Sequence, residues 1–332
     1  MEIPALHKTR ILLTGANGFL GRSILKQLLQ AGCSITLGGR RAPEAWSGAF
    51  IAFDLRNPLL VKQAFAKPCE FDVVIHAAGT LRGNCLGVNH EGTRNLLAEI
   101  APRSGKWIQI SSAGVYRNDL KSLITEETEC EQITEYERSK WLADQEVFSR
   151  HGSCVILRPT MVAGPGMQGC PLRLCLKAIS YGLVPEFDKD AFLNLVHVSD
   201  VAGAALHFCR PSASPGENRE FILSDDLPLR EVVGRMEFVL QKSRPPLLVP
   251  NAFVRAAAMV GTAFSSDLFN MRRYAILNSK ARFATGRFCS LLPSWPSQGS
   301  LSAIDRVCEA YIARTTTRSL TGSPDGFPVS YD

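Results

Sequence analysis

Apolar residues in the first half of the chain follow two alternating spacings. Short runs of consecutive apolar residues, typical of strands buried on both faces, alternate with segments whose apolar residues recur every three or four positions, as in amphipathic helices. The first strand is predicted at 10–14 and the first helix at 21–31, where Ile24, Leu25, Leu28 and Leu29 share one face. Further strands are predicted at 34–37, 49–54, 72–76, 106–111 and 154–158, and further helices at 58–65, 93–100 and 135–148.

This alternation of strands and helices predicts an α/β fold. The expected architecture is a doubly wound parallel sheet that is covered by helices on both faces. Right-handed crossovers place the C-terminal ends of all the strands at one edge of such a sheet, and ligands bind at that edge. Candidate chemistry is therefore expected in the segments that follow each predicted strand.

A glycine-rich loop joins the first predicted strand to the first predicted helix. Glycine at position 15 permits a tight turn, glycine at 18 lets the backbone approach a pyrophosphate, and glycine at 21 allows close packing of the helix. The free N–H groups and the positive dipole end of the helix favour phosphate. The loop predicts dinucleotide binding and identifies the sheet as a Rossmann sheet. The sequence of this loop is Thr14-Gly15-Ala16-Asn17-Gly18-Phe19-Leu20-Gly21.

The end of the second predicted strand bears on the choice between NAD and NADP. An acidic residue there would accept hydrogen bonds from a ribose 2′-hydroxyl. The sequence instead has Arg40 and Arg41, with no acid before Glu44. Guanidinium groups pair well with a 2′-phosphate, so NADP is the expected cofactor, with NAD as the alternative. A solvated basic turn would explain the same residues.

Further motifs follow in the order found in one known family. They resemble those of the extended short-chain dehydrogenase/reductase family, of the NAD-dependent epimerase/dehydratase type, over roughly residues 9–310. The matching segments, beyond the glycine loop, are Asp54-Leu55, His76-Ala77-Ala78-Gly79, Val88-Asn89, Gly92 to Leu97, Ser111-Ser112, Val115-Tyr116, the pair Tyr136 and Lys140, Arg158-Pro159, Gly164-Pro165-Gly166, His197-Val198 and Asp200-Val201-Ala202.

The resemblance implies a set of residues that contact the cofactor. We assign no acid/base role to His76. For Asn89, a structural role stays as open as a contact with the cofactor. Two positions depart from the family pattern: Arg117 stands where the family often has glycine, and no proline precedes Tyr136. These departures weaken any inference of the substrate from the family. The implied contacts are Gly15, Asn17, Gly18, Phe19, Leu20, Gly21, Arg40, Asp54, Leu55, Ala77, Ala78, Gly79, Asn89, Tyr136, Lys140 and Pro159.

Three residues are the candidates for catalysis. Tyr136 is the expected acid/base, and Lys140 lies one helical turn later, so that both share one face. Free tyrosine has a pKa near 10, and a nearby ammonium favours the phenolate. The resemblance implies that Lys140 also holds the nicotinamide ribose. Ser112 would hydrogen-bond the substrate oxygen, and Ser111 remains an alternative.

The second half of the chain predicts a smaller C-terminal substrate-binding lobe. Glycine and proline become denser after residue 159, which is typical of loops rather than of another strand–helix repeat. The expected boundaries are 9–170 for the dinucleotide-binding Rossmann domain, with a returning segment near 190–225, and 171–314 for the lobe. The tail at 315–332 is rich in serine, threonine, glycine and proline, and we expect it to be disordered.

Composition excludes several other classes of protein. The chain has 332 residues, of which 45% are hydrophobic and 20% are charged, as in an ordinary globular enzyme. The formal net charge is +6, but no basic run indicates nucleic-acid binding. The ten cysteines form no CxxC pair, so we expect no metal and a reducing compartment. Neither a signal peptide nor about 18 consecutive apolar residues are present, which predicts a cytoplasmic protein without a transmembrane segment.

The first candidate function is that of an NAD(P)-dependent oxidoreductase or epimerase. It would move hydride between nicotinamide and a carbinol or keto carbon, with a nucleotide-activated sugar as the small-molecule substrate. A dehydratase is disfavoured, because Ala113 and Gly114 follow Ser112 where an acid and a base are needed. The resemblance also implies a homodimer, formed through the helices at 93–100 and 135–148.

Two other functions stay open. The substrate could be an apolar alcohol or ketone, as in the hydroxysteroid dehydrogenase and flavonoid reductase branches. The apolar stretch 247–264 could line such a pocket or lie on a membrane surface, although we interpret it as a core helix of the lobe. The third possibility is a non-catalytic module that senses NADP. The joint presence of Ser112, Tyr136 and Lys140 argues against it.

Overall fold

The structure is a computed structural model of the whole chain, and it describes residues 6, 8–167, 173–213, 219–240, 247–264 and 269–321. Its larger part is a seven-stranded sheet in which every described pairing is parallel. The strands are β1 (Arg10–Thr14), β2 (Ser34–Gly39), β3 (Ala49–Ala52), β4 (Phe71–His76), β5 (Ser104–Ile110), β7 (Cys154–Pro159) and β11 (Glu220–Leu223).

The order of the strands is β11-β7-β5-β4-β1-β2-β3, so the strand order reverses between β1 and β4. Ligands bind in a Rossmann sheet at this switch point, outside the C-terminal ends of the strands. The register places Thr14 of β1 beside His76 of β4. The sequence predicted every strand of this sheet except β11, which lies within the returning segment near 190–225. The α/β Rossmann fold is therefore confirmed.

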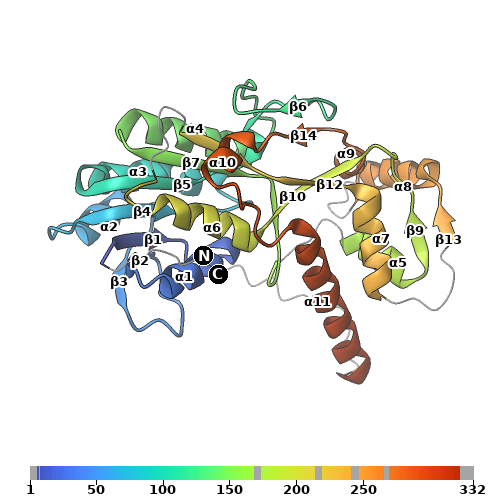
Figure 1. Cartoon of the computed structure of the whole chain (residues 1–332), viewed down its shortest axis with the longest axis horizontal. Helices are drawn as coiled ribbons and strands as arrows, with labels where there is room; N and C mark the ends of the chain where they lie inside the picture. The colour runs from blue at the N-terminus through green and yellow to red at the C-terminus, as the bar shows by residue number, and fades with distance from the viewer. Residues whose placement is uncertain are drawn as a thin grey trace. The chain divides into compact units, whose positions relative to one another are not determined.

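Helices cover both faces of the sheet, as Figure 1 shows. One face packs against α1 (Phe19–Gln30) and α6 (Val198–Phe208), and its core includes Ile11 and Leu13 of β1. The opposite face packs against α2 (Pro58–Ala64), α3 (Gly92–Ile100) and α4 (Glu135–Arg150), and its core includes Leu12. Successive residues of a strand point to opposite faces, which explains why consecutive apolar residues in β1 belong to different cores.

The chain divides into two compact units. The first comprises residues 1–162, 194–226 and 279–300, and holds the sheet; the second comprises 163–193, 227–278 and 301–332. Residues 279–300 belong to the first unit, whereas the sequence analysis placed them in the C-terminal lobe. The reason is a parallel pairing that the sequence pattern does not reveal, between β14 (Arg282–Phe283) and β6 (Leu123–Ile124).

Helices predominate in the second unit. They are α5 (Arg173–Ser180), α7 (Leu229–Leu240), α8 (Asn251–Ala263), α9 (Met271–Leu277) and α11 (Ser300–Thr321), and β13 (Leu247–Val249) pairs with β9 (Leu183–Pro185). Helix α11 continues through residues 315–321, where the sequence predicted disorder, and residues 322–332 lie outside the described ranges. The remaining elements are η1 (Leu86–Glu91), η2 (Ala101–Arg103), η3 (Ala113–Val115), α10 (Gly286–Leu291), and a three-stranded sheet of β12 (Asp225–Pro228), β10 (Phe192–His197) and β8 (Met161–Ala163).

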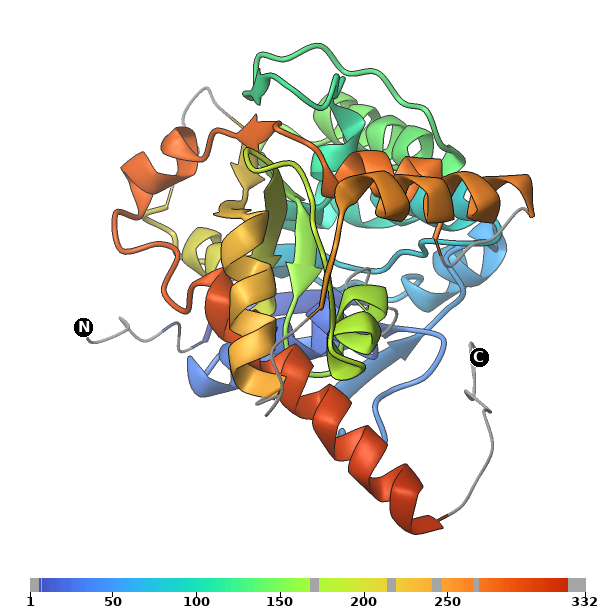
Figure 2. The same cartoon turned by 90° about the vertical axis from the view of Figure 1, so that its right-hand side faces the viewer.

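The interpretation of 247–264 as a core helix is wrong. Only Val254 and Ala258 of α8 are buried, and Phe253 and Phe264 are exposed. The two buried residues are four positions apart, so the helix contacts the rest of the unit along one narrow stripe. Helices α8 and α9, drawn in orange in Figure 2, pack against each other. Among the described residues, no helix is both long enough and apolar enough to cross a membrane.

Candidate functional site

The loop between β1 and α1 has no room for side chains at two of its glycines. Gly15 has a φ of +76°, and a Cβ there would lie 2.5 Å from the backbone nitrogen of Ala78. A Cβ on Gly21 would lie 2.0 Å from the carbonyl oxygen of Gly15. Gly21 is therefore required by the loop itself, rather than by the packing against the sheet that the sequence suggested. The loop is held against the segment that follows β4.

The N-terminus of α1 is open towards this loop. Its N-cap, Gly18, provides no side-chain hydrogen bond, and the first turn contains no acidic residue. Phe19 and Leu20 begin the helix and are partly buried. The amide of Asn17 donates a hydrogen bond of 2.8 Å to the carbonyl oxygen of Arg41, which ties the loop to the segment after β2. The uncapped N–H groups leave a site for an anion.

A cluster of charged side chains lies beyond β2 and β3. Arg40 is exposed after β2, and Asp54 follows β3. The Asp54 carboxylate accepts two hydrogen bonds from Arg56 Nε and one of 2.6 Å from Arg56 Nη2. Arg56, and to a smaller degree Arg40, lower the pKa of Asp54. Neighbouring Leu55 is buried, and its carbonyl oxygen accepts a hydrogen bond from Asn95. Arg56, which was not among the residues predicted from the sequence, adds a cation here.

His76, the last residue of β4, is a buried link between three elements. Its Nδ1 lies 2.7 Å from Thr14 Oγ1, and its Nε2 lies 3.0 Å from Thr93 Oγ1. Burial, with a smaller contribution from the charge of Lys140, lowers the pKa of His76 to about 3. A neutral imidazole has one nitrogen that donates and one that accepts, which suits two hydroxyl partners.

We expect acid to weaken the fold through His76. The unfolded chain protonates this imidazole below about pH 6.5, whereas the folded chain resists protonation down to about pH 3, so stability falls as the pH falls between these values. The loss attributable to His76 should reach roughly 3 kcal/mol at about pH 4.5. Urea unfolding at neutral pH and at about pH 4.5 measures it. His76→Gln should be less stable at neutral pH but lose less on acidification; an equal loss in both proteins would contradict this assignment.

The segment after β4 approaches both η1 and α4. A Cβ on Gly79 would lie 3.0 Å from Asn89 Oδ1 and 3.4 Å from Lys140 Nζ. Asn89 is buried in the π-helical turn η1; its side chain bonds both backbone groups of Thr80 and also Ser139 Oγ. Asn89 thus joins the segment after β4, which also holds Ala77 and Ala78, to helix α4. This is the structural role that the sequence analysis left open.

Helix α4 begins with a capping box that places Tyr136 and Lys140. Thr134 Oγ1 accepts from the backbone of Glu137, whose carboxylate accepts from the backbone of Thr134. Tyr136 lies in the first turn, and Lys140 follows one turn later on the same face. Lys140 is buried and donates a hydrogen bond of 2.7 Å to the carbonyl oxygen of Ile110, at the end of β5.

Burial dominates the titration of both side chains. It lowers the pKa of Lys140 to about 8, partly opposed by the charge of Asp144. It raises the pKa of Tyr136, and the hydrogen bond with Ser112 opposes this rise only in part. The sequence analysis expected a nearby ammonium to favour the phenolate. In this structure the Lys140 ammonium is bound to Ile110, and desolvation of the phenol prevails.

The two serines after β5 have different partners. Ser111 Oγ is buried and donates a hydrogen bond of 2.8 Å to Asp144 Oδ2. Ser112 is the N-cap of the short helix η3 and accepts a hydrogen bond from the backbone of Gly114, and its hydroxyl lowers the pKa of Tyr136. Ser111 is therefore engaged by Asp144, and Ser112 is the serine whose hydroxyl acts on the tyrosine.

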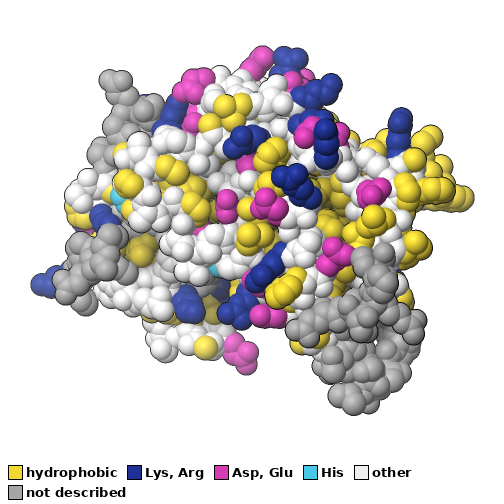
Figure 3. Space-filling view, turned by 45° about the vertical axis from the view of Figure 1, so that its right-hand side comes forward, with side chains coloured by type: hydrophobic (Ala, Val, Ile, Leu, Met, Phe, Trp, Pro, Cys, Tyr) yellow, Lys and Arg dark blue, Asp and Glu magenta, His cyan; other side chains and the backbone are white. Residues whose placement is uncertain are grey.

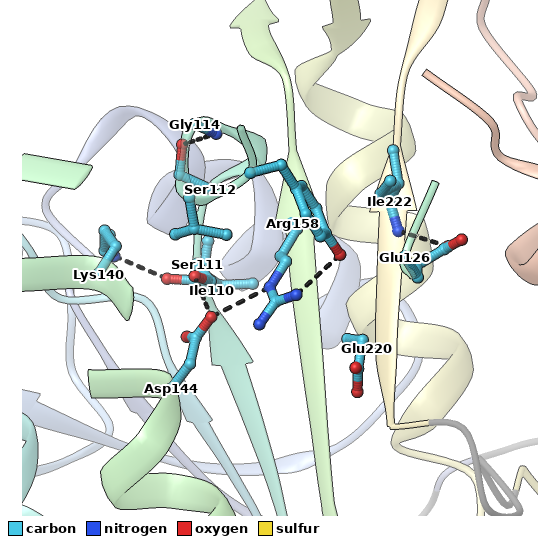
Figure 4. Close-up of polar contacts among 12 residues, drawn as sticks. Ile110, Ser111, Ser112, Gly114, Glu126, Lys140, Asp144, Arg158, Glu220 and Ile222 are labelled. Atoms are coloured by element: carbon cyan, nitrogen blue, oxygen red, sulfur yellow. Dashed lines mark hydrogen bonds and ion pairs between the residues drawn. The ribbon is translucent and has the colours of Figure 1, made fainter. Parts of the chain in front are cut away.

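A buried ionic network lies beside this pair (Figure 4). Asp144 Oδ2 also accepts a hydrogen bond of 3.1 Å from Arg158 Nε, and Arg158 Nη1 donates one of 2.7 Å to Tyr116 Oη. Asp144 lies between this guanidinium and Lys140, whose positive charges both favour its ionised form, while burial raises its pKa. Asp144 Oδ1 has no hydrogen-bond partner among the described residues. Pro159 follows Arg158 and ends β7.

The structure thus brings Ser112, Tyr136, Lys140 and Gly79 together at the C-terminal ends of β4 and β5. Asp144 was not among the residues predicted from the sequence, and Tyr116 was named only as part of a matching segment. The sequence did contain one signal for Asp144. It lies four residues after Lys140 and next to Ala143, so it falls on the face of α4 that the apolar spacing assigns to the core. His197 caps α6 by accepting from the backbone of Ser199. No group of three or more potential metal ligands occurs in the described ranges.

Comparisons with known proteins identify the family of the chain. A family model described as the NAD dependent epimerase/dehydratase family matches residues 11–223. The ceramide reductase of Caulobacter vibrioides is 25% identical over 292 residues, covering 85% of this chain and 84% of that protein. The N-acetyl-alpha-D-glucosaminyl-diphospho-ditrans,octacis-undecaprenol 4-epimerase of Escherichia coli O157:H7 is 24% identical over 253 residues, covering 72% of this chain and 75% of that protein.

Solved structures share the fold at low sequence identity. The UDP-glucuronic acid 4-epimerase of Bacillus cereus, solved in complex with NAD, has a TM-score of 0.66 at 17% identity, and the match covers 91% of this chain and 99% of that chain. The structure of RMD from Pseudomonas aeruginosa, complexed with NADPH, has a TM-score of 0.66 at 19% identity, covering 92% of this chain and 100% of that chain. Nicotinamide dinucleotides thus accompany this fold in both forms.

Proposed function

Because the chain belongs to the NAD-dependent epimerase/dehydratase family and is an enzyme of this kind, we propose that Ser112, Tyr136 and Lys140 interconvert a carbinol and a keto carbon in its substrate. One observation carries the proposal. The Ser112 hydroxyl lies close enough to Tyr136 to lower the pKa of its phenol, and Lys140 on the same face of α4 reaches the end of β5. A proton donor, a second hydroxyl and an ammonium thus meet at the sheet edge where ligands bind.

Tyr136 supplies the proton. Burial raises the pKa of its phenol, so the side chain is protonated at neutral pH. In the reductive direction the phenol donates this proton to the substrate oxygen as negative charge develops there. Ser112 donates a second hydrogen bond to the same oxygen. In the oxidative direction the phenolate would act as the base, and burial makes that form less populated at neutral pH.

Lys140 acts through its charge and its position. Because burial lowers its pKa to about 8, the ammonium is charged at neutral pH and loses its charge in mild alkali. Its hydrogen bond to Ile110 holds it beside Gly79, where the absence of a Cβ leaves space next to the ammonium. We assign the remaining Nζ donors to the ribose hydroxyls of the cofactor. Asn89 positions both flanks of this space through Thr80 and Ser139.

The residues of the first unit fit a nicotinamide dinucleotide. Gly15 and Gly21 keep side chains out of the loop, and the uncapped start of α1 offers N–H groups to a pyrophosphate. When bound, the nicotinamide supplies or accepts the hydride. The proposed contacts remain those of the sequence analysis, with Asn17 acting through its bond to Arg41. Identifying the nucleotide that is released from denatured protein tests this assignment directly.

The proposed cofactor is NADP. Its support is the cluster of Arg40, Asp54 and Arg56, in which two guanidinium groups surround one carboxylate. No acid stands directly after β2, where one would accept a hydrogen bond from a ribose 2′-hydroxyl. Exposed Arg40 can instead pair with a 2′-phosphate. An enzyme that exchanges NADPH for NADP at each turnover fits a reductase better than an epimerase.

Arg40→Ser should weaken NADPH binding about tenfold or more, because charged hydrogen bonds each contribute about 1.5–3 kcal/mol, and it should leave NADH binding nearly unchanged. Fluorescence titration with both cofactors measures this. Arg10→Ser is the matched control, because Arg10 begins β1 at the opposite edge of the sheet and is about half exposed. Equal losses for the two cofactors, or no loss for NADPH, would show that Arg40 does not recognise a 2′-phosphate.

The first proposed substrate class is the nucleotide-activated sugar. The family and the 4-epimerase among the relatives support it. Incubation of the protein and NADP with UDP- and dTDP-linked sugars, followed by absorbance of NADPH, tests this candidate. Interconversion of sugars without net formation of NADPH would indicate an epimerase, and steady formation would indicate a dehydrogenase or reductase.

A ketone with an apolar chain is the second candidate. The ceramide reductase, which matches most of both chains, and the exposed apolar face of α8 favour it. The same assay, run with NADPH and long-chain 3-oxo compounds in detergent, separates this candidate from the first. Inactivity towards both classes, in protein that binds NADPH, would remove both substrate proposals.

We also propose a homodimer formed through α3 and α4. The two helices pack against each other, and Trp141 and Leu142 of α4 are only partly buried in the single chain. Helix pairs from two copies would cover such residues by forming a four-helix contact. Light scattering during size-exclusion chromatography tests the proposal, and a monomer at micromolar concentration would refute it.

A further inference from the structure

Acidic and basic side chains are interspersed over the face of the molecule that Figure 3 shows. Glu135 differs from a typical surface carboxylate in its partners. It is exposed at the first position of α4, directly before Tyr136, and it forms no ion pair with the described residues. Its Oε1 instead accepts hydrogen bonds from two backbone N–H groups, that of Cys85 at 3.0 Å and that of Leu86 at 3.4 Å. The carboxylate therefore binds the backbone of a second helical element.

These two N–H groups belong to the start of the π-helical turn η1. The first N–H groups of a helix have no partner within it and must find acceptors elsewhere. Cys85, the N-cap, provides no side-chain hydrogen bond, and its own N–H is shared between Glu135 and the carbonyl oxygen of Gly83. The N–H of Leu86 has Glu135 as its acceptor. Because η1 runs directly into α3, the carboxylate also lies at the positive end of a longer helix dipole, which favours it.

The turn that Glu135 caps leads to the proposed cofactor side of the site. Asn89 lies in η1 and bonds both backbone groups of Thr80. Thr80 follows Gly79, beside which the proposed ribose-binding space lies. On the other side, Glu135 is joined through the chain itself to Tyr136, the proposed proton donor. One carboxylate thus connects the backbone beside the cofactor to the backbone that carries the phenol.

Other bonds of α4 do not replace this connection. The hydrogen bonds of the capping box join Thr134 and Glu137, which lie in one segment, so they define where the helix begins without attaching it to another element. Asn89 does attach η1 to α4, but through Ser139, which comes after the first turn. The first turn is the part of a helix that frays. Its position against η1 therefore depends on Glu135.

We propose that Glu135 is a positioning residue that sets where the phenol of Tyr136 lies relative to the cofactor. The inference rests on the proposed function, because it takes Tyr136 as the proton donor. Bonding the neighbouring residue to η1 holds the first turn of α4 in one place. A misplacement of about 1 Å can lower the rate of an enzyme by about 10²-fold, so a bond that fixes this turn matters for turnover more than for binding.

Glu135→Ala and Glu135→Gln in the full chain test the proposal. The alanine variant loses both hydrogen bonds, so its kcat should fall about tenfold or more, while KM and the dissociation constant of NADPH stay within about twofold. The amide oxygen of glutamine can still accept both N–H groups, so Glu135→Gln should keep kcat within about threefold of the wild type. The probes are UDP- and dTDP-linked sugars with NADP, and long-chain 3-oxo compounds with NADPH.

Amide hydrogen exchange measures the contact itself, without a substrate. In Glu135→Ala the amides of Cys85 and Leu86 should exchange at least about tenfold faster, because they lose an acceptor. The bond between Asn89 and Ser139 still joins η1 to α4 in this variant. We therefore expect its circular dichroism to match that of the wild type.

Glu231→Ala is the matched control. Glu231 is also exposed and also lies in the first turn of a helix, α7. Its replacement removes a carboxylate from a helix start without affecting η1, so kcat and the exchange of Cys85 and Leu86 should stay unchanged. An equal fall of kcat in Glu231→Ala and Glu135→Ala would overturn the proposal.

The remaining outcomes separate this inference from the proposed function. Wild-type kcat in Glu135→Ala, while Tyr136→Phe is inactive, would overturn the positioning role and leave the proposed function intact. Unchanged exchange at Cys85 and Leu86 would also overturn it, as would a Glu135→Gln variant as slow as Glu135→Ala. Wild-type turnover in Tyr136→Phe, or a wild type inactive with every probe, would overturn the proposed function and this inference with it.

Discussion

Tyr136→Phe should lower kcat by about 10³-fold, because general acid–base catalysis by a positioned side chain typically contributes about 10²–10⁴-fold. The change removes a single hydroxyl, whose pKa Ser112 lowers, and it keeps the phenyl ring. NADPH should still bind within about twofold of the wild-type affinity, since charge-assisted contacts of the phosphates hold most of the cofactor. Steady-state turnover and fluorescence titration, on the same preparation, measure the two effects.

Tyr116→Phe is the control for this prediction. It also removes a phenol hydroxyl, but that hydroxyl accepts a hydrogen bond from Arg158 and is buried. We expect this variant to lose about 1–3 kcal/mol of stability, as when a buried donor is left unpaired, and to retain turnover within about tenfold. Wild-type turnover in Tyr136→Phe, or equal inactivation of both variants, would show that Tyr136 is not the proton donor.

Asp144→Asn should destabilise the fold by about 3–5 kcal/mol, because removing one partner of a buried ion pair leaves an uncompensated charge. Asp144 is completely buried, and its carboxylate receives Arg158 and Ser111. The amide keeps the shape of the side chain but removes the charge that balances Arg158 and Lys140. Urea denaturation measures the loss. Asp72→Asn is the control, since Asp72 pairs with Arg10 at the surface and should contribute less than about 1 kcal/mol.

The same variant should move the alkaline limit of activity. The charge of Asp144 partly opposes the effect of burial on Lys140, whose pKa is about 8. Removing that charge lowers the pKa of Lys140 further, so the enzyme should lose activity at a lower pH than the wild type. A pH–rate profile measures this shift, which a purely structural defect would not produce. If Asp144→Asn is as stable as the wild type, Asp144 is not ionised in the fold.

Local patterns in the sequence were sufficient for most of the sheet domain. The apolar runs of β1, β4 and β7 and the amphipathic spacing of α1 are signals that act over a few residues, as is the capping box that begins α4. The glycine loop was equally readable, because a turn with φ of +76° at Gly15 restricts the residue type directly. Strand β11 and the pairing of β14 with β6 were not found, because each depends on a partner far away in the chain.

The sequence by itself determined the parallel α/β architecture, the phosphate loop and the pairing of Tyr136 with Lys140, because these features follow from spacing within one loop or one helix. Only the tertiary structure decided which serine meets the tyrosine, since Ser111 and Ser112 differ in the direction of their side chains rather than in type. It also decided that burial raises the pKa of Tyr136, that Asp144 joins Arg158, and that α8 exposes its apolar residues. Desolvation, ion pairing and exposure are set by what surrounds a residue in space, and neighbours from distant segments provide those surroundings.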